Sequence, residues 1–418
     1  MGSAKLIKTI KDKEKTKILL LEGIHENAEK MFRDNGYTNV KSYKGALDSN
    51  ELIKEIKNTA ILGIRSRTKI TEDILRSAPN LLSVGCFCIG TNQVDLTAAK
   101  KLGIPVFNSP YSNTRSVAEL VLGEIIMLFR RVFEKSALSH RGIWDKSAAG
   151  CVEARGKTLG IIGYGHIGSQ LSILAESIGM SVIYHDIIDV LPMGNAKKTA
   201  SLAELLNTAD IVSLHVPETP ATKNMIKNEQ LKQMKKGAFL INASRGKVVD
   251  IDAVAEYLKS GHLAGAAFDV FPKEPAINKE EFISPLRIFD NVILTPHIGG
   301  STKEAQAGIS IEVSNKLIKY LDNASTLGSV NFVEVSLPQQ DKKKTTRFIH
   351  IHKNVPGILS AINNVFSELH INIAGQYLRT DSDIGYVVLD IDENIKKQDE
   401  FLDKLNNIQG TIRVRIIH

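Results

Sequence analysis

One stretch constrains the fold of this chain more than any other: a glycine-rich turn between a predicted strand and a predicted helix. Residues 158–162 are a short apolar run typical of a buried strand, and residues 169–178 have helical spacing. Between them lie Gly163, Gly165 and Gly168. In this pattern the first glycine permits a tight turn, the second lets the backbone approach a pyrophosphate, and the third allows close helix–strand packing. Because a helix N-terminus also attracts anions, the stretch predicts a dinucleotide-binding turn.

An acidic residue at the end of the next predicted strand indicates which dinucleotide binds. The apolar run 180–184 ends at His185 and Asp186. A carboxylate there accepts hydrogen bonds from the ribose hydroxyls of the adenosine half and repels a 2′-phosphate. A lone glycine motif can arise for conformational reasons alone, but here strand, helix and acid agree. We therefore expect NAD rather than NADP.

Composition excludes several classes of protein. No apolar run approaches the roughly 18 residues of a membrane span, and the lysine-rich start lacks the apolar segment of a signal peptide, so we expect a cytoplasmic protein that does not bind membranes. Much of the formal net charge of +7 lies in the N-terminal tail and in Lys342–Lys344, which favours solvated segments over a nucleic-acid surface. Cys86, Cys88 and Cys151 lack the spacing of structural zinc ligands, so neither metal nor disulfide is expected.

The order of predicted elements indicates three domains. Strands and helices alternate twice, which predicts two Rossmann-like lobes with doubly wound parallel sheets. Two long helices, a strongly apolar one predicted at 116–130 and a second at 303–321, join the lobes. The last part of the chain has the order strand, helix, strand, strand, helix, strand of a ferredoxin-like α+β domain. The expected division is a substrate-binding domain of residues 1–112 and 301–336, a dinucleotide-binding domain of 113–300, a linker of 337–346 and a C-terminal domain of 347–418.

Three residues that follow predicted strands of the second lobe could carry chemistry: Arg245, Glu274 and His297. Arginine can hold a substrate carboxylate through two parallel hydrogen bonds. Histidine exchanges protons near neutral pH, and a paired carboxylate would orient it and raise its pKa. Each alone could be a helix cap, a solvated turn or a surface residue. Together with the dinucleotide turn they fit the oxidation of a 2-hydroxy acid, in which His297 removes the hydroxyl proton.

The chain resembles a known family over nearly its whole length after the tail. Six motifs carry the resemblance: Arg65–Thr68, Gly85–Gln93, Ser112–Ser116, Gly163–Gly168, Ala243–Gly246 and His297–Gly300. On these motifs it is similar to the D-isomer-specific 2-hydroxyacid dehydrogenases, in the branch with a C-terminal ACT domain. The resemblance implies Arg245, Glu274 and His297 as catalytic residues. It also supports NAD binding by Gly163, Gly165, His166, Ile167, Gly168, Asp186, Ala243, Ser244, Arg245, Asp269, His297, Ile298, Gly299 and Gly300.

The resemblance implies 3-phosphoglycerate as the substrate, oxidised to 3-phosphohydroxypyruvate. This molecule carries a carboxylate and a phosphate, so its site needs several cations. Arg65 and Lys44 are favoured beside Arg245, whereas Arg67 and Arg115 are better explained as solvated charges. Reduction of 2-oxoglutarate to 2-hydroxyglutarate is left open as a further activity. Two alternatives remain at this point: another D-2-hydroxyacid dehydrogenase, and an NAD-sensing binding protein without catalysis.

The ACT resemblance implies an amino-acid effector, L-serine, bound between paired domains of a homotetramer. The implied contacts are His352, Asn354 and Asn372, and asparagine side chains can both donate to a carboxylate and accept from an ammonium. The alternative is a domain that only joins subunits. His350 and His352 alternate with isoleucines, which predicts a strand with one solvated face.

Overall fold

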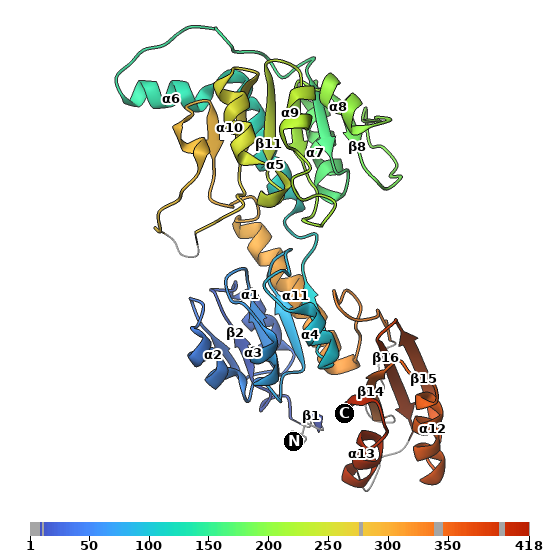
Figure 1. The fold of residues 1–418 in the computed structure, drawn as a ribbon. Coiled ribbons are helices and arrows are strands. Elements are labelled where there is room, and N and C mark those ends of the chain that lie inside the picture. Colours follow the sequence, from blue (N-terminus) through green and yellow to red (C-terminus); the bar gives the residue numbers. More distant parts are fainter. Residues whose placement is uncertain (1–8, 11, 276–278, 338–345, 393–397, 418) are drawn as a thin grey trace. The chain divides into compact units, whose positions relative to one another are not determined.

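The computed structural model describes residues 9–10, 12–275, 279–337, 346–392 and 398–417, and Figure 1 shows their fold. The chain divides into two compact units, Asn113–Ala305 and Met1–Ser112 with Gln306–His418. The expected doubly wound lobes and the separate C-terminal α+β domain are confirmed. Among the described residues, no helix has the length and apolar character needed to cross a membrane.

The unit Asn113–Ala305 is built on a seven-stranded sheet in the order β13-β12-β11-β10-β7-β8-β9, with every pair parallel. The strand order reverses beside β7, and ligands bind at such switch points, outside the carboxyl ends of the strands. Its strands are β7 (Thr158–Ile162), β8 (Ser181–His185), β9 (Lys197–Lys198), β10 (Ile211–Leu214), β11 (Ala238–Asn242), β12 (Leu263–Phe268) and β13 (Val292–Leu294).

Helices cover both faces of this sheet (Figure 1). Side chains along a strand point alternately to the two faces: Leu159 and Ile161 belong to one hydrophobic cluster and Ile162 to the other. Burial on both faces explains why these strands read as continuous apolar runs. The helices are α5 (Thr114–Arg130), α6 (Val132–His140), α7 (His166–Ser177), α8 (Leu202–Thr208), α9 (Asn228–Gln233) and α10 (Ile251–Lys259), with 3-10 turns at Gly246–Val248 and Pro285–Ile288.

The first lobe of the other unit has a five-stranded parallel sheet in the order β3-β2-β4-β5-β6. The long helix α11 packs on one face through Val313 and Leu317, and a side chain at Gly85 would meet both of them within 3 Å. The elements are β2 (Ile18–Leu20), β3 (Val40–Ser42), β4 (Ile61–Ile64), β5 (Ser83–Cys86), β6 (Val106–Asn108), α1 (Asn27–Asp34), α2 (Ser49–Ile56), α3 (Glu72–Arg76), α4 (Leu96–Lys101) and α11 (Lys303–Asn323).

The C-terminal domain is an antiparallel sheet in the order β17-β14-β16-β15, joined at one edge by β1. The pairing of β1 with β17 is parallel, so part of the charged tail, expected to be solvated, is a sheet edge. The elements are β1 (Thr9–Ile10), β14 (Thr346–Lys353), β15 (Ile373–Thr380), β16 (Ile384–Ile391), β17 (Thr411–Ile417), α12 (Ile358–Glu368) and α13 (Gln398–Asn406). Residues 338–345 of the expected linker lie outside the described residues.

The prediction of one solvated face on β14 is wrong. Phe348, on the same side as the two histidines, packs with buried residues of α12 and α13. On the opposite side Ile349 and Ile351 pack against Phe332 and Val335, which follow α11. His350 and His352 are themselves 0 % and 4 % exposed. The alternation of histidine and isoleucine therefore marks two different buried surfaces.

Candidate active site

The glycine turn has the geometry that close approach of a pyrophosphate requires. Gly163 has a φ of 91°, and a Cβ atom there would lie 2.4 Å from the carbonyl oxygen of His215. A Cβ at Gly168 would lie 2.3 Å from the carbonyl oxygen of Gly163. At Gly165, the N-cap residue of α7, a Cβ would meet none of the described atoms within 4 Å. The turn therefore leaves an open approach to the helix N-terminus, which fits the pyrophosphate of a dinucleotide.

Asp186 is fixed beside this turn, directly after β8. One carboxylate oxygen, Oδ2, accepts the backbone N–H of Tyr164 at 2.7 Å, and Oδ1 accepts the N–H of Ile188 at 2.9 Å. The side chain is partly exposed, so its lone pairs remain accessible. An acceptor held at this point suits the ribose hydroxyls of the adenosine half.

His297 and Glu274 form the pair that the sequence predicts. The distance from His297 Nδ1 to Glu274 Oε2 is 2.9 Å, and Glu274 Oε1 accepts the N–H of Phe271 at 3.1 Å. The hydrogen bond with Glu274 raises the pKa of His297, and the negative charges of Glu274 and Asp269 add to it. Burial raises the pKa of Glu274, but the hydrogen bond and positive charge of His297 outweigh burial and lower that pKa overall. With Nδ1 donating to the carboxylate, Nε2 is the basic nitrogen of the neutral ring.

The loop that carries His297 is anchored by Asp269, a residue the sequence predicted as a cofactor contact. The Asp269 carboxylate is 1 % exposed. Its Oδ1 accepts the hydroxyl of Thr295 at 2.6 Å and the N–H of Ile298 at 2.7 Å, and Oδ2 accepts the N–H of Gly299 at 2.8 Å. A charge buried with three donors is strongly held, so Asp269 fixes the loop backbone on either side of His297.

Arg245 follows β11 in a loop organised by Asn242, which sequence reasoning missed. The Asn242 side chain donates to the carbonyl of Arg245 at 3.0 Å and accepts from the N–H and the hydroxyl of Ser244. A side chain at Gly246 would lie 2.0 Å from a backbone atom of Phe271, so this loop packs directly on the segment before Glu274. A polar residue that ends an otherwise apolar strand was the available signal for Asn242. Arg245 itself is partly buried, and its charge acts on the pKa of both His297 and Glu274.

In the other unit, Arg65 and Lys44 occupy loops after β4 and β3. The Arg65 carbonyl accepts the side-chain N–H of Gln93 at 2.6 Å. The carboxylate of Glu22, another residue that sequence reasoning missed, accepts the N–H groups of Arg67 and Thr68 at 2.9 and 2.8 Å. These contacts fix the backbone that carries Arg65, while Lys44 is exposed.

The predicted effector residues differ in environment. His352 is buried on β14, the Asn354 side chain donates to the carbonyl of Asp381 at 2.6 Å, and Asn372 is exposed just before β15.

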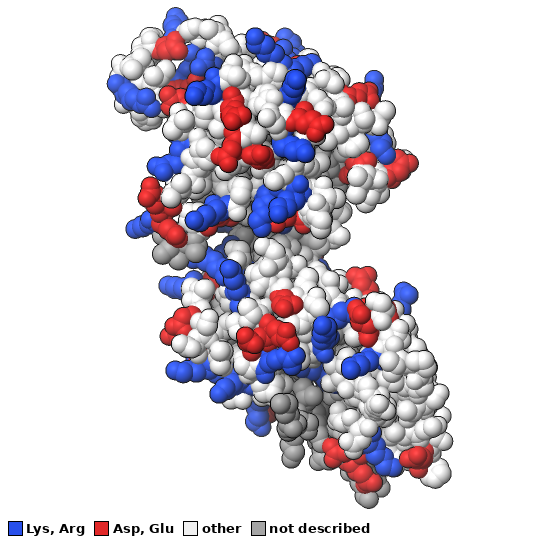
Figure 2. All heavy atoms as spheres, in the orientation of Figure 1, with Lys and Arg blue, Asp and Glu red and all other residues white. Residues whose placement is uncertain are grey.

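Lysine and arginine side chains are interspersed with acidic ones on the face shown in Figure 2. Among the described residues, no group of three or more histidine, cysteine, aspartate and glutamate side chains could hold a metal ion.

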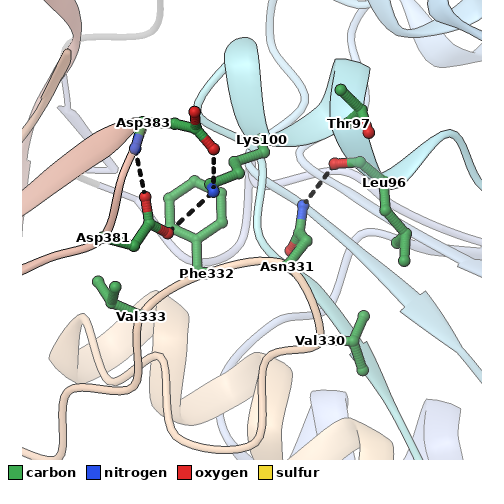
Figure 3. A pocket seen from close by; sticks show the side chains of 9 residues that line it. All are labelled: Leu96, Thr97, Lys100, Val330, Asn331, Phe332, Val333, Asp381 and Asp383. Atoms are coloured by element: carbon green, nitrogen blue, oxygen red, sulfur yellow. Dashed lines mark hydrogen bonds and ion pairs between the residues drawn. The ribbon is translucent and has the colours of Figure 1, made fainter. Parts of the chain in front are cut away.

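A cavity of about 410 Å³ lies between α4, the segment after α11 and the turn between β15 and β16 (Figure 3). Lys100 extends into it and binds Asp381 at 2.9 Å and Asp383 at 2.7 Å. Asn331, on its wall, bonds to the carbonyls of Leu96 and Ile104. The residues that line this cavity include none of the predicted site residues.

Comparisons with known proteins identify related families and structures. Residues 122–299 match the family model described as D-isomer specific 2-hydroxyacid dehydrogenase, NAD binding domain, and residues 348–413 match an AHAS small subunit-like ACT domain. D-3-phosphoglycerate dehydrogenase from Haemophilus influenzae is 60% identical over 97% of this chain and 98% of that protein. The corresponding protein of Escherichia coli K12 is 57% identical with the same coverage. A crystal structure of D-lactate dehydrogenase from Aquifex aeolicus, complexed with NAD and lactic acid, has a TM-score of 0.67 and 27% identity over 76% of this chain and all of that chain.

Proposed function

The chain belongs to the D-3-phosphoglycerate dehydrogenase family, and from this membership we propose a catalytic mechanism built on His297, Glu274 and Arg245. It is an NAD-dependent oxidoreductase with an ACT domain, and its reaction is the oxidation of 3-phosphoglycerate to 3-phosphohydroxypyruvate. The observation that carries the mechanism is the 2.9 Å pair of His297 and Glu274, in the same unit as the glycine turn.

NAD, when bound, supplies the acceptor for the hydride that leaves C2 of the substrate. His297 removes the proton of the C2 hydroxyl through Nε2, and Glu274 stabilises the imidazolium that forms. The Arg245 guanidinium holds the substrate carboxylate. The turn from Gly163 to Gly168 binds the pyrophosphate, and Asp186 binds the adenosine ribose. Further contacts to the cofactor come from the segments 243–245 and 297–300, as the family resemblance implies.

The remaining assignments concern the substrate phosphate and regulation. Arg65 and Lys44 supply cations for the phosphate, and Glu22 and Gln93 support the backbone around Arg65. L-serine binds the ACT domain at His352, Asn354 and Asn372 and inhibits the enzyme, which is a homotetramer. The functional domains are residues 1–112 with 301–336 for substrate, 113–300 for NAD, and 347–418 for regulation, with 337–346 as the linker.

An assay of NADH oxidation tests this function. The full-length protein should turn over 3-phosphohydroxypyruvate but not pyruvate, and L-serine should suppress the turnover. Activity on pyruvate would favour another D-2-hydroxyacid dehydrogenase. Turnover that L-serine does not affect would support the dehydrogenase function and contradict L-serine as the effector. NADH binding without turnover on either substrate would favour a binding protein.

A further inference from the structure

Two buried histidines of the C-terminal domain lie in a chain of hydrogen bonds that the catalytic mechanism does not use. The Nδ1 atoms of His350 and His352 are 3.3 Å apart. On the other side of the first ring, His350 Nε2 lies 3.0 Å from the hydroxyl of Thr411 on β17. That hydroxyl lies 3.1 Å from the carbonyl oxygen of Leu405, in the last turn of α13. This chain of hydrogen bonds, which we call the relay, therefore runs from a helix terminus to a predicted effector residue.

The donors and acceptors available in these groups determine which atom donates in each hydrogen bond of the relay. The Leu405 carbonyl can only accept, so the single hydroxyl hydrogen of Thr411 goes to it. The Thr411 oxygen then accepts from His350, which places the proton of that ring on Nε2. A neutral imidazole carries one N–H, so His350 Nδ1 is an acceptor and His352 Nδ1 donates to it.

Backbone carbonyls and burial both act on the pKa values of the two rings. The carbonyl of Leu405 also acts on His350 as a hydrogen-bond acceptor and opposes the lowering of its pKa, as the carbonyl of His350 does for His352. Burial lowers the pKa of His350 to about 4, with the charge of His352 adding to the effect. Burial also lowers the pKa of His352. Both rings are therefore neutral near pH 7, and the hydrogen-bond directions given above then place the proton of His352 on Nδ1.

The opposite nitrogen of His352 is placed by a glycine on the neighbouring strand. Gly385 pairs with His352 in the register of β14 and β16. A Cβ atom at Gly385 would lie 2.1 Å from His352 Nε2, so the ring occupies the space that any other residue would fill. His350 on one side and Gly385 on the other thus fix both the position and the tautomer of the ring.

We propose that His350 and Thr411 are positioning residues that hold His352 in its Nδ1–H tautomer, so that Nε2 accepts a hydrogen bond from a donor group of a bound amino acid. This inference rests on the effector site proposed above. The α-ammonium and the hydroxyl of L-serine are donors of the required kind, whereas a carboxylate offers only lone pairs. The relay therefore orients the effector with a donor group towards His352.

Matched substitutions at Thr411 in the full-length protein test the relay. Thr411→Val keeps the shape but removes the hydroxyl, and Thr411→Ser keeps the hydroxyl. Equilibrium binding of radiolabelled L-serine should weaken about tenfold in the valine variant and stay within about threefold of the wild type in the serine variant. Turnover without L-serine should be unchanged in both, because Thr411 lies outside the proposed catalytic residues. Equal serine affinity of the two variants would overturn the proposal.

Nitrogen NMR of the full-length protein with ¹⁵N-labelled imidazoles measures the tautomer directly, without any ligand. The His352 signals are assigned by their loss in His352→Gln. Nε2 of His352 should be unprotonated in the wild type and in Thr411→Ser, and partly protonated in Thr411→Val, a change that loss of packing alone would not produce. A proton on Nε2 in the wild type would overturn the relay. Failure of the wild type to bind L-serine would overturn the acceptor role together with the proposed effector, and the tautomer would still decide the relay.

Discussion

At the scale of the residue, the proposed active site includes a backbone conformation that side chains rarely adopt. His297 has a φ of 56°, in the left-handed region that favours glycine. Asp269 stabilises this conformation, because its carboxylate accepts the N–H groups of Ile298 and Gly299, the two residues that follow His297. Strain of this kind persists where the surroundings over-determine it, and here it directs the imidazole to Glu274.

Replacement of Glu274 by glutamine should change the pH dependence of the reaction in a defined direction. The carboxylate raises the pKa of His297, so its removal lowers that pKa. In the proposed mechanism oxidation needs unprotonated His297, and the acidic limb of the kcat/KM profile should therefore move to lower pH. The maximal rate should fall by on the order of 10², because the imidazolium loses its partner. The measurement is the rate of NAD reduction across pH.

The exposed Glu281 provides the matched control. Glu281→Gln removes a carboxylate from the same segment and should leave the profile in place. An acidic limb that stays fixed in Glu274→Gln, or moves to higher pH, would show that Glu274 does not set the basicity of His297.

Single residues also show how far sequence alone could reach. Arg245, Glu274 and His297 were predicted because each stands out chemically after an apolar strand. Asn242 and Glu22 were not, because their function lies in hydrogen bonds to backbone N–H groups that come from loops or from distant residues. Such partners exist only in the folded chain.

At the scale of the element, the pattern of apolar residues predicted the central strands of a sheet and missed elements at the edge of a sheet or on the surface. The strand β7, which packs against buried clusters on both faces of its sheet, was predicted to the residue as 158–162. The edge strand β3 was missed, because Val40, Lys41 and Ser42 are partly or fully exposed and carry no alternation. Helix α6 was missed for a related reason: none of its residues is buried.

Helix α5 contains a buried acid that the apolar pattern concealed. Glu124 is 0 % exposed, and neither carboxylate oxygen has a hydrogen-bond partner among the described residues. Burial raises its pKa from 4.5 to about 8, and the negative charge of Asp269 adds to the shift. The folded chain thus keeps a proton that the unfolded chain releases, so the free energy of unfolding falls as the pH rises from 4.5 to about 8.

Glu124→Gln should remove this dependence, because glutamine is neutral in both states. Its melting temperature should be close to that of the wild type at about pH 5 and higher at about pH 8. Glu119→Gln changes an exposed acid of the same helix and is the control. If wild type and Glu124→Gln lose the same stability between the two pH values, Glu124 is not the group responsible.

At the scale of the whole molecule, the ACT domain and the first lobe belong to one compact unit. Buried side chains of the ACT sheet donate to carbonyl groups of the lobe and of the segment after α11: Arg413 to Leu81 at 2.6 Å, and Tyr386 to Ala324 at 2.8 Å. At the margin of this contact, Lys100 binds Asp381 and Asp383 (Figure 3). Sequence could predict both folds but not these contacts, because neither partner carries a local pattern for the other.

Lys100→Met should weaken this contact while keeping the length of the side chain. Loss of two partly exposed ion pairs should cost at most about 1 kcal/mol of stability, which is measured as a lower melting temperature. High salt should lower the melting temperature of the wild type as well, because it screens these ion pairs. Lys101→Met, at the exposed neighbouring position, should have no effect. Equal melting temperatures of the two variants would mean that the ion pairs contribute nothing in solution.

The most direct test of the central claim, that His297 is the acid–base group of the dehydrogenase, is the turnover of His297→Asn measured together with its NADH affinity. The mechanism predicts a loss of turnover on the order of 10² to 10⁴ with NADH binding retained, and no loss in His140→Asn, which changes an exposed histidine of the same unit. Normal turnover of His297→Asn with 3-phosphohydroxypyruvate would contradict the mechanism.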